Sequence, residues 1–265
     1  MCVNKKLLRI MSIALAAVML FSLCSCDTYV EEEKKIQYAS EVPADKAAIV
    51  ERFNKVLADA KAGKPTVSYS LDQGTGKCEC ENEYVKASFK TVANLITDES
   101  FGMSTEYGQD TTDILPVMGK ADAGMVDLVD VRTAFITDNK EDKTYTIVIT
   151  INPEENPEQD GSVYGKLFKI EKDEDILKNF DNIKHLMTAE KYSASYKIGS
   201  IKAVIHKGTD HLIKLELHRD VRVETEVTGQ GNLADIGTVP LAFDYNSTAK
   251  YDLDWDNPDT EAIDD

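Results

Sequence analysis

The feature that most constrains the fold is a long alternation of apolar and polar residues in the last third of the chain. The apolar residues occupy odd positions: Ile213, Leu215, Leu217, Val221, Val223 and Val227. The polar and charged residues occupy even positions: Lys214, Glu216, His218, Asp220, Arg222, Glu224 and Glu226. A period of two predicts a β-strand with one packed face and one solvated face. Strands usually have about five or six residues, and one this long seldom stays flat, so we predict a curved antiparallel sheet.

Helical periodicity is found in three other stretches. The first places its apolar residues on one stripe: Ile49, Val50, Phe53, Val56, Leu57 and Ala60. Pro43 suits the first turn of this helix, and Gly63 followed by Pro65 is a stop signal. A second helix is predicted from about Glu81 to Ile96, with these residues inward: Tyr84, Val85, Phe89, Val92 and Ile96. A short third helix is predicted over 173–185.

The remaining strand signals complete the fold class. Polar turns predict two hairpins, one joining 128–137 to 144–151 and one joining 201–206 to the run from Leu212. Further strands are predicted at Val67–Leu71 and over 241–255, the latter with Tyr251, Leu253 and Trp255 on one face. Residues 98–127 contain four glycines and one proline, which break any pattern. The sequence therefore predicts an α+β fold, in which two or three helices pack on one face of a curved antiparallel sheet.

The first residues have the pattern of an export signal. Three basic residues lie within residues 1–9, and 10–23 is almost entirely apolar, the length of a signal h-region and short for a membrane span. The tetrapeptide Leu23-Cys24-Ser25-Cys26 then resembles the lipobox of bacterial prolipoproteins. The resemblance implies cleavage before Cys26 and diacylglyceryl on its sulfur. An ordinary secretory signal and an uncleaved anchor helix are the alternatives.

These signals predict the organisation and location of the chain. We expect a signal peptide over 1–25, a lipid anchor and polar tether over 26–42, one α+β domain over 43–256 and an acidic tail over 257–265. The polar, proline-containing loop at 152–162 is the best internal boundary of that domain. The expected location is the outer face of the cell membrane. The two acyl chains of a diacylglyceryl anchor are sufficient for stable membrane binding.

Charge narrows the range of partners. The chain has a formal net charge of −17, and loss of residues 1–25, with three basic residues and no acidic one, would make it about −20. Such a surface repels nucleic acid and anionic lipid headgroups. We therefore expect no nucleic-acid partner, and membrane contact through the lipid anchor only.

Two cysteines, Cys78 and Cys80, lie in the body of the chain, next to the glycine-rich stretch Gly74–Lys77, which predicts a turn. Outside the cytoplasm they could form a disulfide, although a ring between residues two apart would be strained. Free thiols are the second interpretation. Half of a metal site is the third, but a tetrahedral zinc site needs two more ligands.

Other short motifs do not make a catalytic site. The acids over 252–259 lack the central Gly and distal Glu of a calcium loop. His218-Arg219-Asp220 copies the start of a kinase catalytic loop without its other motifs, and Ser247-Thr248-Ala249-Lys250 lacks the partners of penicillin-interacting enzymes. His206 and His211 flank one hairpin turn without metal-ligand spacing. We predict neither an enzyme nor a cofactor or metal site.

The whole pattern, with hairpins such as Val131–Ile151, resembles uncharacterised lipoproteins of Gram-positive bacteria. More distantly, the architecture resembles the lipid carriers of the LolA and mycobacterial LppX type, in which a curved sheet closed by helices holds acyl chains. This resemblance implies a lipoprotein that binds a hydrophobic or small ligand. The alternative is an interaction or scaffold protein of the cell envelope, with an acidic face for its partner.

Overall fold

The computed structural model describes residues 45–89, 101–116, 124–170 and 184–255. Contacts divide the chain into Met1–Gln37 and Tyr38–Asp265, and all of the described residues belong to the second unit. The expectations for the signal peptide, Cys26, the tether, the acidic tail and nearly all of the helix over 173–185 lie outside the described residues. None of the helices in the described ranges is long and apolar enough to cross a membrane.

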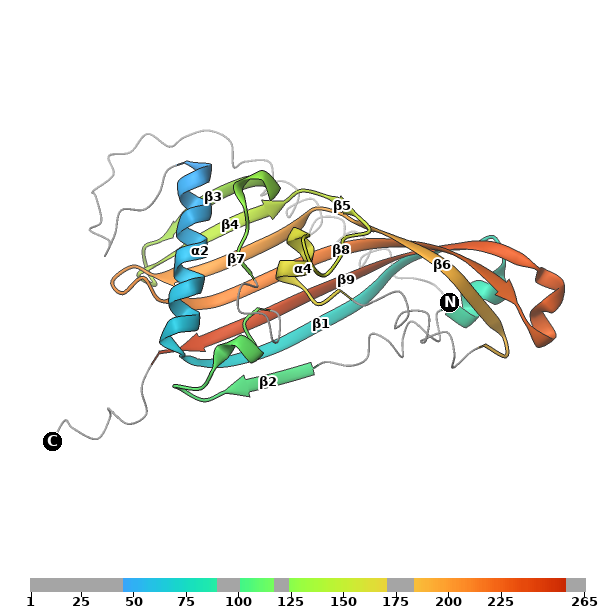
Figure 1. The fold of residues 1–265 in the computed structure, drawn as a ribbon, viewed down its shortest axis with the longest axis horizontal. Helices are drawn as coiled ribbons and strands as arrows, with labels where there is room; N and C mark the ends of the chain where they lie inside the picture. Colours follow the sequence, from blue (N-terminus) through green and yellow to red (C-terminus); the bar gives the residue numbers. More distant parts are fainter. Residues whose placement is uncertain (1–44, 90–100, 117–123, 171–183, 256–265) are drawn as a thin grey trace, which may run out of the picture. The chain divides into compact units, whose positions relative to one another are not determined.

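The described residues form one nine-stranded antiparallel sheet, which confirms the predicted fold class (Figure 1). Its main path runs β2-β1-β9-β8-β7-β4-β3, while β6 pairs with both β8 and β5. The strands are β1 (Thr66–Glu79), β2 (Phe101–Thr105), β3 (Val131–Asn139), β4 (Thr144–Ile151), β5 (Glu154–Glu155), β6 (Met187–Tyr196), β7 (Gly199–His206), β8 (Leu212–Gly229) and β9 (Thr238–Asp254).

The predicted long strand is β8, and it organises the sheet. One of its edges pairs with β9 from Lys214 to Thr228. The other edge is shared, because β7 pairs with its first part and β6 pairs with it from Val221 onward. One detail of the prediction is wrong: a bulge at the start of the strand turns Leu212 into the core, and Ile213 lines the opposite face.

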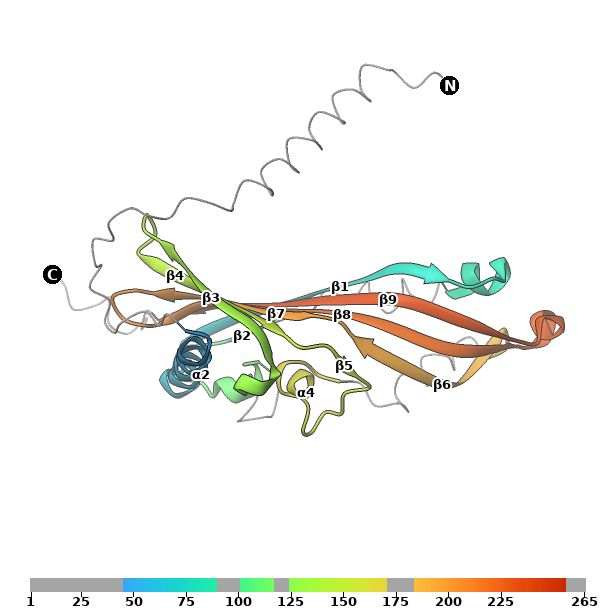
Figure 2. The same cartoon turned by 90° about the horizontal axis from the view of Figure 1, so that it is seen from above.

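The first predicted helix is α2 (Lys46–Gly63), and the whole predicted stripe is buried. Asp45 caps its N-terminus by accepting a hydrogen bond from the Ala48 amide, while Pro43 lies outside the described residues. The buried stripe packs on β3, β4 and β8. The short helix α4 (Val163–Leu167) lies on the same side of the sheet, as Figure 2 shows. We call this side the inner face and the opposite side the outer face.

The second predicted helix begins at residue 83 and is described to residue 89. Val85 and Phe89 are buried as expected, but Tyr84 is 73% exposed, so its predicted inward position is wrong. The Asn82 side chain accepts hydrogen bonds from the amides of Tyr84 and Val85 and so fixes the rotation of the first turn. Val92 and Ile96 lie outside the described residues.

Both predicted hairpins are confirmed, with small shifts. Residues 128–130 form a 3₁₀ turn, η2 (Leu128–Asp130), ahead of β3, so the first strand of that hairpin begins at Val131. The β7–β8 turn includes Lys207, whose buried ammonium pairs with Asp138 at the end of β3. Two more 3₁₀ turns, η1 (Thr111–Asp113) and η4 (Gly231–Ile236), complete the described helical elements.

The predicted turn at Gly74–Lys77 is wrong, since these residues and Cys78 continue β1. The strand follows β9 along its length, with Gly74 opposite Asn246 and Cys78 opposite Phe243. The register shifts between Thr75 and Cys78, which is where the glycine-rich residues lie. Glycine accommodates such bulges readily, so local turn chemistry gives way to pairing with the long partner strand.

Candidate ligand-binding site on the inner face

The inner face has two apolar clusters. The larger lies under α2 and α4, and the smaller contains Val85 and Phe89 together with Met187, Val227 and Leu241. Both clusters include side chains of β8 and β9 that share one face of the sheet. The candidate site lies where they meet.

A polar row crosses the inner face at this junction. Gln73 of β1 lies opposite Ser247 of β9, and Ser247 lies opposite Arg219 of β8. Directly opposed residues share a face, so the three side chains form one row. On one side of it lie Leu71, Ala249 and Leu217, and on the other Tyr245 and Val221. Ser247 is completely buried.

Arg219 is the charged member of this row. Its Nε donates a hydrogen bond to Ser247 Oγ at 2.9 Å, and its Nη1 donates one to the Lys169 carbonyl at 3.2 Å. The guanidinium carbon lies 4.8 Å from the ring centre of Phe168, and 5.7 Å from those of Tyr196 and Tyr245. The two hydrogen bonds leave N–H groups of both terminal nitrogens without a hydrogen-bond partner in the described part of the chain.

Arg219 lacks a carboxylate at ion-pair distance within the described ranges. The arginines Arg52 and Arg222, in contrast, pair with Asp210 and Glu79. Hydrogen bonds to a hydroxyl and a carbonyl, with aromatic rings nearby, compensate only part of the cost of placing a cation on an apolar face. The arginine therefore retains capacity to bind an anion.

Partly exposed side chains surround this arginine. We define the junction patch as Leu71, Gln73, Arg219, Val223, Phe243 and Tyr245, each of intermediate burial. The Tyr245 hydroxyl donates to Gln73 Oε1, which holds the ring beside the polar row. Burial raises the pKa of nearby Tyr69, whereas the positive charge of Arg219 lowers it. The charge of Arg219 therefore acts on other side chains of the inner face.

The cysteines lie at the edge of this region. Both Cys78 and Cys80 are free and of intermediate burial, and they pack against the smaller apolar cluster. Burial, and then the neighbouring Cys80, raises the pKa of Cys78, which favours the unreactive thiol form. The residues that the structure describes contain no group of three or more metal-ligating side chains.

The remaining motifs are separated by the geometry of the strands. Arg219 lies on the inner face, while His218 and Asp220 face outward, so the kinase-like tripeptide is not a unit. Ser247 and Lys250 likewise lie on opposite faces of β9, where Lys250 pairs with Asp72.

The two hairpin histidines have separate roles. His206 contacts Thr209 through Nδ1, and His211 stacks on Trp255 at 3.8 Å between ring centres. Of the terminal acids, Asp252 pairs with Lys214 at 3.3 Å, and 256–259 lie outside the described residues. These contacts are those of surface and packing groups.

The outer face carries paired charges. Glu79 is bound by Lys77 and Arg222, and hydrogen bonds from these two side chains lower its pKa to about 2. Asp244 pairs with Lys197 at 3.2 Å. This part of the surface is therefore mixed in charge, although the chain as a whole is acidic.

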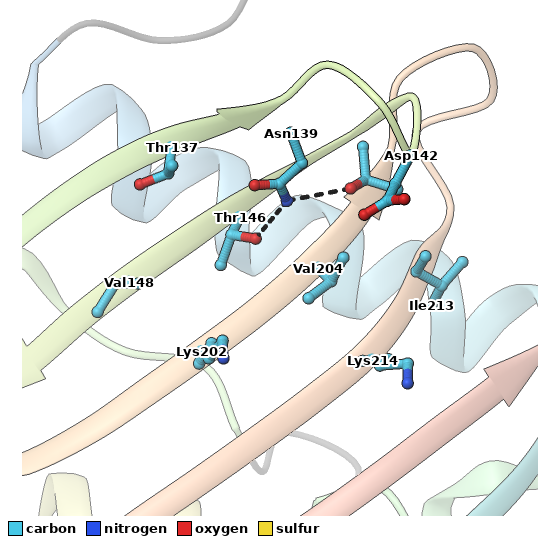
Figure 3. Close-up of a pocket in the computed structure, with 10 residues that line it drawn as sticks. Thr137, Asn139, Asp142, Thr146, Val148, Lys202, Val204, Ile213 and Lys214 are labelled. Carbon is cyan, nitrogen blue, oxygen red and sulfur yellow. Dashed lines mark hydrogen bonds between the residues drawn. The ribbon is translucent and has the colours of Figure 1, made fainter. Parts of the chain in front are cut away.

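An open hollow of about 670 Å³ also lies on the outer face. Figure 3 shows its side chains on β3, β4, β7 and β8, with α2 behind the strands. They are Thr137, Asn139, Asp142, Thr144, Thr146, Val148, Lys202, Val204, Ile213 and Lys214. The Asn139 amide already donates to Thr144 and Thr146, at 3.1 and 2.8 Å. The hollow thus combines two exposed lysines with three aliphatic side chains and several hydroxyls on an open surface.

Sequence reasoning missed Arg219 as a site residue. The signal was present, because residue 219 is an odd position within an alternation whose odd positions are mostly apolar. A comparison with protein-family models, curated proteins and solved structures found no match to this chain.

Proposed function

We propose that this chain is a lipoprotein, anchored through Cys26 on the outer face of the cell membrane, that binds a small, largely apolar ligand at the junction patch. The observation that carries the proposal is the placement of a charged side chain beside partly exposed aromatic and aliphatic ones, where two apolar clusters meet. Ligand sites are commonly apolar with a few placed polar groups. The lipobox supports the location, and the tether after it would leave the domain free to meet its ligand.

Photo-crosslinking of the full chain in its membrane tests this proposal. The probe is a twelve-carbon chain with a diazirine and an alkyne, offered both as the acid and as the alcohol. We expect cross-linked peptides to come from the inner faces of β1, β8 and β9. Labelling confined to the outer face or to residues 26–42 would contradict a ligand site at the junction patch.

A matched pair of substitutions locates the site further. Val223→Trp would fill the junction patch and reduce labelling several-fold. Val204→Trp makes the same change on the outer face of β7, beside the hollow, and should leave labelling unchanged. Limited proteolysis of both variants would verify that each is folded.

The second candidate function is an interaction protein that uses an acidic face. The net charge of −17 favours it. The pairing of outer-face acids with lysines and arginines disfavours the sheet as that face. Salt-sensitive cross-linking of one specific protein in cells, without labelling by either lipid probe, would favour this function instead.

A further inference from the structure

We infer that the ligand of the junction patch is a long-chain monocarboxylate, whose carboxylate is held by Arg219. This inference rests on the proposed function and specifies the class of ligand. It depends on three features of the site: the N–H groups that Arg219 has left, the charges around it, and the apolar surface beside it.

The remaining donors of Arg219 fit a carboxylate. Nε donates to Ser247, and one N–H of Nη1 donates to the Lys169 carbonyl. As far as the described residues show, an N–H on Nη1 and both on Nη2 remain available. One N–H from each terminal nitrogen can bind the two oxygens of a carboxylate in a bidentate pair. The bond to completely buried Ser247 fixes the guanidinium plane from the other side.

The charge at the site matches a single anionic group. Within the described ranges, the groups that contact Arg219 are a hydroxyl, a carbonyl and three aromatic rings, none of which carries a negative charge. The lysines of β8 and β9, Lys214 and Lys250, are engaged by Asp252 and Asp72 on the outer face. A guanidinium presents a planar pair of N–H donors, which matches the two oxygens of a carboxylate.

The surface next to Arg219 suits an acyl chain. Along β8 and β9 the inner face continues through Tyr245, Val223 and Phe243 toward the smaller cluster. From Arg219 to Val223 the strand advances by four residues, which is about 14 Å at about 3.4 Å per residue. An extended chain can lie along this length with its carboxylate at the polar row.

The experiment compares two photoreactive probes that differ only in the head group, a dodecanoate and the corresponding dodecanol. The full chain in its membrane is labelled with each probe over a range of concentrations. We expect the acid to label the junction patch at about tenfold lower concentration than the alcohol, as expected for a charge-assisted hydrogen-bonded pair. Arg219→Met should bring this ratio close to one. Arg132→Met, at an exposed position of β3, is the matched control and should keep the ratio.

Each outcome of this experiment has a distinct meaning. Labelling of the junction patch by neither probe overturns the proposed function. Equal labelling by both probes leaves a ligand site in place but overturns the carboxylate assignment, and so does an acid preference that persists in Arg219→Met. A third probe with a methyl phosphodiester head group tests the other source of an oxyanion, and its preference over the acid would also overturn the assignment. An acid preference that requires Arg219 supports it.

Discussion

Tyr164 of α4 offers a sharp test of how the helical layer is fixed to the sheet. Its side chain is completely buried. The hydroxyl donates to the Lys197 carbonyl and accepts from the Gly199 amide at 2.8 Å, at the start of β7. A Cβ on Gly199 would lie 3.0 Å from this hydroxyl, so the close approach requires glycine there. Tyr164→Phe keeps the ring but removes both hydrogen bonds.

The expected loss can be estimated from these contacts. A buried N–H without an acceptor costs about 1–3 kcal/mol, and the carbonyl loses a weaker, partly solvated interaction. We therefore expect Tyr164→Phe to lower the free energy of unfolding by about 2–3 kcal/mol. Tyr84→Phe, at a 73% exposed position, is the control and should change it by less than about 0.5 kcal/mol.

Urea unfolding followed by circular dichroism measures this difference. The slope of free energy against urea should be unchanged, so that the midpoint alone moves. Burial raises the pKa of Tyr164 to about 12, so its contribution is complete below about pH 10 and decreases as the pH rises from about 10 to about 12. The wild type should lose more stability in that range than Tyr164→Phe does. A variant as stable as the wild type at pH 7 would refute the assumption that Gly199 depends on this hydroxyl.

Three further predictions concern other contacts. Arg52→Met removes the cationic partner of the largely buried Asp210 carboxylate, which keeps the Tyr145 hydroxyl as a contact, and should lower the free energy of unfolding in urea by about 3–5 kcal/mol. Arg52→Met combined with Asp210→Asn should recover part of this loss, and an additive loss would contradict the coupling. The cationic neighbours of Glu79 hold its pKa at about 2, so its contribution to stability is present above about pH 4.5 and is lost as the pH falls toward 2. Glu79→Gln should therefore make the urea midpoint less dependent on pH between about 4.5 and 2. Iodoacetamide, without reductant, should modify Cys78 and Cys80 in unfolded protein, and their failure to react would indicate a disulfide. In folded protein at pH 7, Cys78 should react more slowly than it does in unfolded protein, because folding raises the pKa of its thiol.

The sequence predicted the elements whose pattern is set by burial. The stripe of α2 and the alternation of β8 were readable because each residue position maps onto one face. The same mapping explains the error at Ile213, where a bulge shifts the register in a way that apolar content alone does not reveal. Tyr84 was wrongly placed inward for a related reason. Tyrosine is amphipathic, and helical spacing alone could not place it without knowledge of the Asn82 cap.

The candidate site was less predictable, for a physical reason. Arg219 interrupts the alternation, but one charged residue at an inward position is also what a strand end or a bulge would produce. Its meaning depends on Ser247 of the next strand and on Gln73 of β1, far earlier in the chain, which meet it only through the register of the sheet. The full length of β1 could not be predicted for the same reason. Taken alone, the residues of Gly74–Lys77 favour a turn, and they form a strand because β9 pairs with them.

The shared edge of β8 has a consequence for how the domain opens. Its first part is held by β7 within the large apolar cluster, and its second part by β6, along which the large cluster gives way to the small one. Segments with fewer buried contacts open at lower free energy. Amide hydrogen exchange should thus divide this single strand into a slowly exchanging half and a faster one, with the boundary near Arg219. A molecule bound across that boundary would slow exchange in the weaker half, and would make the strand respond as one unit.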